Sequence, residues 1–224
     1  MGLDRGVLND RRGDAMDYIY WSRPSQNVLS GGHSELYQYA AEYIGIDKEI
    51  DYLEFGVGHG KSISEIVKLF TNKNSRFYGF DSFVGLPEKW LMHDVGAFSN
   101  NGVFPDINDP RVSFVKGWFQ NTVPNFLREF KSKVGRPVFI HFDADLYAST
   151  LFLLANIWQF VDEYYFMMDD FIHDDVIAFR DFEAAFPVKF KFFAQTAGGG
   201  ITRRNPDQVF GHMKRKTFEL PTAI

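Results

Sequence analysis

The chain contains no cysteine among its 224 residues. This absence excludes disulfide bonds, thiolate metal sites and a cysteine nucleophile, and it fits a reducing cytoplasm. Long hydrophobic runs are missing too, because Asp, Lys or Gly interrupts each apolar stretch well before the ~18 residues that a membrane span needs. Residues 1–5 lack the apolar core of a signal peptide. We therefore expect a cytoplasmic protein without membrane contact.

Positive charge is scarce as well. Lys and Arg number 24 against 29 Asp and Glu, which gives a formal net charge of −5. Neutralising the phosphates of a nucleic acid needs clustered positive charges, so no nucleic-acid partner is expected. The one basic cluster, 214–216, is interpreted as a solvated strand or tail.

Aromatic residues, by contrast, are abundant. They make up 17% of the chain, and 25 of them are Phe. This excess predicts a thick aromatic core or a pocket lined with rings for a flat ligand. The chain shows no internal repeat, and its length fits one elaborated domain.

Short apolar runs alternate with segments of helical spacing along the chain. The expected strands cover 50–55, 76–80, 111–115, 137–142, 163–168 and 188–194, and the expected helices cover 34–43, 62–70, 123–131, 149–160 and 175–186. We expect Ser34 to cap the first helix, Gly45 to end it, and Pro124 to lie in the first turn of the helix at 123–131. This order predicts a doubly wound, mostly parallel α/β sheet with helices on both faces. Ligands of such sheets bind beyond the carboxyl ends of the strands, at the topological switch point.

Alternate glycines follow the first of these strands. Gly56, Gly58 and Gly60 allow a tight turn and a close approach of the backbone to a ligand, and Ser62 opens the next helix. A P-loop is rejected because its first glycine would fall one residue short, on Phe55. A dinucleotide fingerprint is disfavoured because the third glycine comes one residue early. The spacing, preceded by an acid at position 54, resembles motif I of class I methyltransferases.

An acid follows the second strand at the position where cofactor sites of this fold bind ribose. Asp81 lies about twenty residues beyond the glycines, where a carboxylate accepts hydrogen bonds from both ribose hydroxyls. The alternative is a turn or capping acid.

Further acids follow two neighbouring strands. Asp143 and Asp145 come after the strand at 137–142, and Asp169 and Asp170 come after the strand at 163–168. Carboxylates that share one cleft either hold protons or bind a cation, and oxygen-only ligation favours Mg²⁺. Such an ion activates a hydroxyl for attack on a methyl group. The alternative is that Asp143 and Asp169 cap the helices that follow them. Asp174 and Asp175 are expected to be a helix-capping pair and not part of the site.

Taken together, these motifs resemble the macrocin O-methyltransferase family, the metal-dependent sugar O-methyltransferases. The matching segments are 52–62, 78–87, 116–119, 122–124, 141–150 and 169–170. The resemblance implies a Rossmann-like fold, bound S-adenosylmethionine (SAM), and Mg²⁺ held by Asp143, Asp169 and Asp170. It also implies that Asp143 takes the proton of the acceptor hydroxyl. Catechol-type relatives carry a lysine where this chain has Leu146, which favours a sugar-type acceptor.

The cofactor candidates are the residues of these motifs that lie at strand ends: Glu54, Gly56, Gly58, Gly60, Ser62, Asp81, Ser82, Gly117, Trp118 and His141. For Trp118 and His141, a place in the core is an equally good interpretation. Residues 94–109 are a candidate lid.

The chain is divided into an N-terminal arm and helix at 1–48, expected to shape the acceptor site and a homodimer contact, and a SAM-binding domain at 49–224. The expected partner is a small hydroxylated acceptor that contains a sugar. Two alternatives stay open: a metal-independent methyltransferase acting on an amine or carboxylate, and a non-catalytic nucleotide-binding α/β protein.

Overall fold

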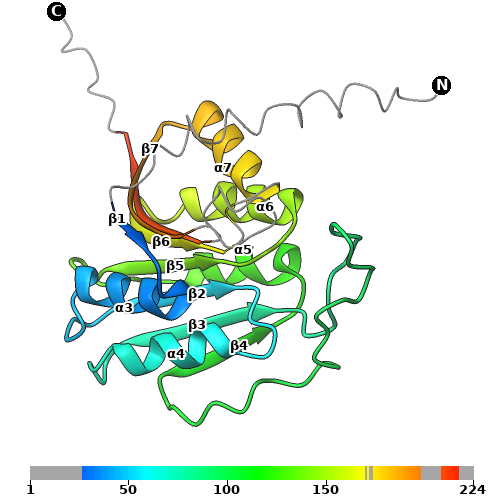
Figure 1. Cartoon of the computed structure of the whole chain (residues 1–224), viewed down its shortest axis with the longest axis horizontal. Helices are drawn as coiled ribbons and strands as arrows, with labels where there is room; N and C mark the ends of the chain where they lie inside the picture. Colours follow the sequence, from blue (N-terminus) through cyan, green and yellow to red (C-terminus); the bar gives the residue numbers. More distant parts are fainter. Residues whose placement is uncertain (1–26, 170, 172–173, 198–207, 217–224) are drawn as a thin grey trace, which may run out of the picture.

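A computed structural model describes residues 27–169, 171, 174–197 and 208–216 (Figure 1). Its strands form one eight-stranded sheet in the order β1-β7-β8-β6-β5-β2-β3-β4. The strands are β1 (Asn27–Leu29), β2 (Asp51–Phe55), β3 (Arg76–Asp81), β4 (Val112–Lys116), β5 (Val138–Phe142), β6 (Glu163–Met168), β7 (Val188–Thr196) and β8 (Val209–Arg215). Only β8 runs antiparallel to its neighbours, β6 and β7, within the described sheet. The mostly parallel, doubly wound fold is thus confirmed.

The helices cover both faces of the sheet (Figure 1). They are α3 (Gly32–Ile44), α4 (Lys61–Leu69), α5 (Phe119–Glu129), α6 (Tyr147–Trp158) and α7 (Asp174–Ala185). Side chains alternate between the faces along each strand. In β2, Leu53 and Phe55 join the core beneath α5, α6 and α7, whereas Tyr52 joins the core beneath α3 and α4. The strands between the two cores are buried on both sides, which explains their continuous apolar sequence.

Two strands have no counterpart among the predicted ones. The short edge strand β1 pairs with β7, and β8 enters the sheet between β7 and β6. Gly211 interrupts the apolar pattern of β8, and a Cβ there would lie 2.4 Å from the carbonyl oxygen of Lys191. The glycine is therefore required by packing. Lys214 and Arg215 lie within β8 and pair with Glu163 and Asp162. Lys214 is exposed, as expected for a solvated strand, whereas Arg215 packs over the Trp158 ring.

Two predictions about helix starts are wrong. Helix α5 begins at Phe119, with Trp118 as its N-cap, so Pro124 lies inside the helix and not in its first turn. Helix α3 begins after Gly31, and its N-cap makes no side-chain hydrogen bond, so Ser34 is not the cap. Instead, the Glu35 carboxylate accepts a hydrogen bond from the Gly31 N–H. The predicted end of α3 at Gly45 is confirmed.

Ionic contacts fix the amino end of the sheet, far along the strands from the glycine turn. Asp51 is fully buried at the start of β2. Its carboxylate accepts hydrogen bonds from Arg76 at 2.6 and 2.7 Å and from Arg136 at 2.8 Å. Because the carboxylate has partners from β3 and from the segment before β5, it ties three neighbouring segments together.

Candidate functional site

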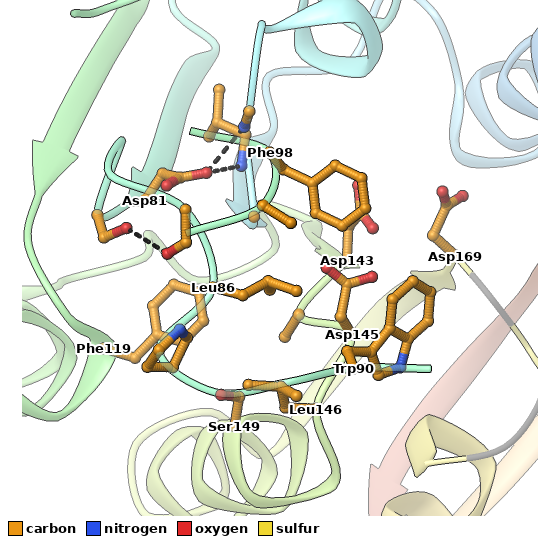
Figure 2. A pocket seen from close by; sticks show the side chains of 18 of the residues that line it. Asp81, Leu86, Trp90, Phe98, Phe119, Asp143, Asp145, Leu146, Ser149 and Asp169 are labelled. Carbon is orange, nitrogen blue, oxygen red and sulfur yellow. Dashed lines mark hydrogen bonds between the residues drawn. The ribbon is translucent and has the colours of Figure 1, made fainter. Parts of the chain in front are cut away.

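A cavity of about 690 Å³ lies at the carboxyl ends of the central parallel strands (Figure 2). The predicted site residues that line it are Gly56, Gly58, Ser62, Asp81, Ser82, Gly117, Trp118, Asp143 and Asp169. Glu54, Gly60 and His141 are not among the lining residues. Asp170, the third predicted metal ligand, lies outside the described residues. The cavity therefore brings together the glycine turn, the acid after β3 and acids from β5 and β6.

The glycine turn is shaped by the close approach of two strand ends. Gly56 has φ +96°, and a Cβ there would lie 1.7 Å from the carbonyl oxygen of Asp143. The Gly56 N–H donates to the Phe80 carbonyl at 2.9 Å, and the Asp143 N–H donates to the Phe55 carbonyl at 2.9 Å. These hydrogen bonds continue the pairing of β2 with β3 and β5 past the ends of the strands. They bring the backbones so close together that only glycine fits at position 56.

The other two glycines differ in their surroundings. Gly58 has φ +51°, and a Cβ there would meet no atom within 4 Å, so its backbone faces open space in the cavity wall. Gly60 is the N-cap of α4, and a Cβ there would lie 2.6 Å from Pro105. Its small size thus serves packing against the β3–β4 connection, away from the cavity.

Asp81 links the end of β3 to the glycine turn. One carboxylate oxygen accepts hydrogen bonds from the N–H groups of Val57 and Gly58 at 2.9 and 2.8 Å. The other oxygen accepts one from the Phe83 N–H at 2.6 Å. The side chain lines the cavity (Figure 2). A carboxylate has about four lone-pair positions, so Asp81 keeps acceptor capacity for a ligand.

A buried polar cluster lies behind the glycine turn, on the side of α3 and α4. Tyr52, Glu54 and His141 each have 0% of their surface exposed. Glu54 accepts hydrogen bonds from the Tyr52 hydroxyl and, at 2.7 Å, from Ser62 Oγ. Burial by itself would lower the pKa of His141, but the carboxylates of Asp169 and Glu54 outweigh it and raise the pKa to about 9. Glu54 and His141 therefore support the cavity wall from behind.

Three acids from the ends of β5 and β6 face the cavity: Asp143, Asp145 and Asp169 (Figure 2). Asp145 adopts φ +60°, a backbone conformation that non-glycine residues rarely hold away from functional sites. Within the described residues, no three His, Asp or Glu side chains converge closely enough to hold a metal ion. Asp169 Oδ1, however, is buried without a hydrogen-bond partner among those residues. An unsatisfied buried carboxylate oxygen is an atom that a cation would satisfy.

The capping interpretation of these acids is wrong. Helix α6 has Leu146 as its N-cap, so Asp143 lies too early to cap it. Helix α7 begins at Asp174, well beyond Asp169. Asp175, expected to belong to a capping pair, is buried and accepts a hydrogen bond from the Thr150 hydroxyl of α6.

Four further residues line the cavity that the sequence did not single out. Trp90 and Phe98, which we call the aromatic wall, line it from the β3–β4 connection (Figure 2). His33 and Tyr37 line it from α3. Phe98 belongs to the segment 94–109, expected as a lid. Burial and the nearby charge of Asp169 raise the pKa of Tyr37, so its hydroxyl stays protonated. No local motif marks these four residues, because each reaches the cavity through a long loop or a neighbouring helix.

The doubly wound sheet, the glycine turn and the acid after β3 at the switch point are together typical of a class I SAM-dependent methyltransferase. Residues 34–191 match the model of the macrocin-O-methyltransferase (TylF) family. The chain belongs to this family and is a SAM-dependent O-methyltransferase. A comparison with curated protein sequences gave no significant match.

Solved structures agree on the fold. The O-methyltransferase NovP is 22% identical, with a TM-score of 0.56 over 82% of this chain and 79% of that one. An O-methyltransferase from Bacillus cereus in complex with SAH is 13% identical, with a TM-score of 0.55 over 95% of this chain and 92% of that one. No helix in the described ranges is both long and apolar enough to cross a bilayer.

Proposed function

We propose that the chain transfers the methyl group of SAM to a hydroxyl of a sugar-containing acceptor, with Mg²⁺ bound at the acids after β5 and β6. The observation that carries this proposal is the shared cavity. Asp143 and Asp169 line the same space as Gly58 and Asp81. A methyl donor held by the turn therefore lies in one compartment with carboxylates that can handle an acceptor hydroxyl.

Residues that follow β2, β3 and β4 form the proposed binding site for the methyl donor. Three of the about four lone-pair positions of Asp81 are used, and the remaining one suits a ribose hydroxyl. The open side of Gly58 leaves room for the donor against the turn. Ser62 and Ser82 offer hydroxyls, while Gly117 and Trp118 lie at the end of β4, where an adenine ring fits. Trp118 is 38% exposed, so its ring is open to stacking and is not a core residue.

The proposed metal ligands are Asp143, Asp169 and Asp170. The donor set fits a hard cation, and Asp169 Oδ1, which accepts no hydrogen bond from the described residues, supports it. When bound, Mg²⁺ would supply positive charge that lowers the pKa of an acceptor hydroxyl. His141 lies behind Asp169, with its Nε2 3.8 Å from Asp169 Oδ1. This positive neighbour favours the ionised carboxylate that a cation needs.

Asp143 is the proposed base. In the transfer, a bond forms between the acceptor oxygen and the methyl carbon, the carbon–sulfur bond breaks, and the hydroxyl proton passes to the Asp143 carboxylate. The position that carries lysine in catechol-type relatives is the apolar Leu146, which lines the cavity and is 4% exposed. Because Leu146 has no proton-accepting group, the role falls to a neighbouring acid.

The aromatic wall supports a ring-shaped acceptor. Trp90 and Phe98 offer flat apolar faces, and His33 and Tyr37, which line the same cavity, offer polar atoms. A sugar ring presents apolar faces and hydroxyl edges, which this combination suits. The contribution of α3 supports the proposal that 1–48 shapes the acceptor site. Residues 1–26 of that region lie outside the described residues. A homodimer and a cytoplasmic location stay predictions.

The test is methyl transfer from labelled SAM to a panel of sugar-containing acceptors. Activity should vanish with EDTA and return with Mg²⁺, and Asp143→Asn should lose at least a hundredfold in kcat, as expected for the loss of a general base. Asp162→Asn is the matched control, because its side chain is 77% exposed and lies at the far end of β6.

Two outcomes would favour the other functions. Turnover that is insensitive to EDTA would contradict the metal and favour transfer to an amine or carboxylate. Tight SAM binding without metal affinity and without transfer to any acceptor would favour a non-catalytic nucleotide-binding protein.

A further inference from the structure

The buried cluster behind the glycine turn contains ionisable side chains, which packing alone does not require. Glu54 and His141 carry ionisable groups at fully buried positions of adjacent strands, where they face each other across the register of β2 and β5. On the opposite face, the neighbouring positions hold Phe55 and Phe142. Burying a carboxylate has a large desolvation cost unless it is well hydrogen-bonded, so its partners matter.

The hydroxyl of Tyr52 is the centre of this cluster. It donates to Glu54 Oε2 and lies 3.1 Å from His141 Nδ1, which can donate to it in return. The other carboxylate oxygen, Oε1, accepts the hydrogen bond of Ser62 Oγ at 2.7 Å. A continuous series of hydrogen bonds therefore runs from His141 through Tyr52 and Glu54 to Ser62.

Only the last residue of this series reaches the cavity. Ser62 lies in the first turn of α4 and lines the cavity, whereas Tyr52 and Glu54 do not. The Ser62 hydroxyl has three staggered rotamers available, and the bond to Glu54 selects one of them. The Tyr52 hydroxyl binds the other oxygen of the Glu54 carboxylate, Oε2. It therefore holds Glu54 in the rotamer whose Oε1 accepts the bond from Ser62.

We infer that Tyr52 is a positioning residue for SAM: its hydroxyl fixes the Glu54 carboxylate, which in turn fixes the Ser62 side chain against the donor. The inference rests on the proposed role of Ser62 in binding SAM. It assigns to Tyr52 and Glu54 an action through Ser62, because neither side chain touches the cavity.

The first experiment measures the Kd of SAM by calorimetry for Tyr52→Phe, without metal or acceptor. The variant keeps the ring and removes the hydroxyl, and SAM binding should weaken about tenfold, the effect of losing one hydrogen bond to a charged group. Tyr164→Phe is the matched control. Tyr164 is buried on the other face of the sheet, and its hydroxyl has no hydrogen-bond partner among the described residues. The control should leave the Kd of SAM unchanged.

A double-mutant cycle then separates positioning from general loosening of the fold. Ser62→Ala should weaken SAM binding by itself, and adding Tyr52→Phe to it should bring no further loss. If the two effects add in full, Tyr52 acts by another route and the inference is overturned. It is also overturned if Tyr52→Phe leaves the Kd unchanged, or if Tyr52→Phe weakens binding while Ser62→Ala does not.

Glu54→Gln provides a second cycle with Ser62→Ala, should Tyr52→Phe fail to fold by circular dichroism. The amide keeps the shape of the side chain but removes the negative charge that strengthens the hydrogen bonds from the Tyr52 and Ser62 hydroxyls. Adding Glu54→Gln to Ser62→Ala should therefore bring no further loss of SAM binding. These cycles use SAM alone. Their result can therefore be interpreted even if the proposed Mg²⁺ or acceptor chemistry is wrong.

Discussion

Gly56 and Asp143 touch through their backbones at the point where β2 and β5 leave the sheet. A Cβ on Gly56 would stand 1.7 Å from the Asp143 carbonyl oxygen, at φ +96°. The same contact therefore sets both the turn proposed to face the donor and the residue proposed as base. A displacement of either strand end would move both.

Gly56→Ala tests this contact. We expect a loss of ~3 kcal/mol or more in the free energy of unfolding, because the methyl group must push two strand ends apart. SAM binding should fall with it. Gly58→Ala is the control, since its Cβ would meet nothing within 4 Å, and only the ~1 kcal/mol cost of a positive φ is expected. Urea denaturation measures both. Equal losses in the two variants would contradict the role of the Asp143 contact.

Asp81→Asn tests the acid after β3. The side chain holds the Val57 and Gly58 N–H groups and is proposed to bind ribose. An amide presents one acceptor oxygen where the carboxylate has two, so we expect SAM binding to weaken by ~1.5–3 kcal/mol, which is about 10- to 150-fold. Calorimetry with SAM gives the value. An unchanged Kd would refute the ribose role.

Asp51→Asn tests the ionic contacts at the amino end of the sheet. Asp51 is fully buried between Arg76 and Arg136, so the variant takes the carboxylate partner from Arg76 and leaves Arg136 with Glu49 alone. We expect a loss of ~3 kcal/mol in the free energy of unfolding. Lys133→Ala, which removes an exposed partner of Glu49, should cost less than ~1 kcal/mol. The Kd of SAM should be unchanged in both variants because the contacts lie at the opposite end of the strands.

The Asp109–Arg111 pair predicts a dependence of stability on acid. The Arg111 guanidinium donates hydrogen bonds to the Asp109 carboxylate and to the carbonyls of Val67 and Phe70 at the end of α4. Asp109 therefore holds Arg111 in place. The hydrogen bonds from Arg111 outweigh burial and lower the pKa of Asp109. A lowered pKa means that the stabilisation is complete above the ordinary value near 3.8 and is lost as the pH falls through the value in the folded state.

Urea denaturation between pH 6 and pH 3 measures this effect. Asp109→Asn should lower the stability at pH 6 and flatten its fall towards acid. A fall of the same steepness in the variant and the parent chain would contradict the assignment to Asp109.

Phe98→Ala tests the aromatic wall. Phe98 is 49% exposed at the cavity, so the loss of its ring should leave the core intact and raise the KM of the acceptor about fivefold to tenfold. Val95→Ala, at a 67% exposed position of the same connection, is the control. A change in the Kd of SAM without a change in the acceptor KM would show that Phe98 contacts the donor, and it would contradict a contact with the acceptor.

Much of the fold follows from local signals. The strands β2, β3, β5 and β6 are predicted to within a residue at each end, because buried parallel strands have apolar runs that end in glycines or acids. The start of α5 is mispredicted because Pro124 looks like a first-turn residue, whereas the helix begins at Phe119 and Pro124 lies in its interior. Strand β8 is missed because its partners lie far away in sequence and Gly211 breaks its pattern.

Because glycines and acids directly follow recognisable strands, the amino-acid sequence alone predicts which strand ends carry them and where the cavity lies. That Glu54 lies behind the cavity with Tyr52 and His141, and that Trp90, Phe98 and Tyr37 line it, became clear only from the three-dimensional arrangement. Side-chain partners across a sheet, and cavity linings built from loops, depend on contacts between distant segments, and such contacts leave no local pattern.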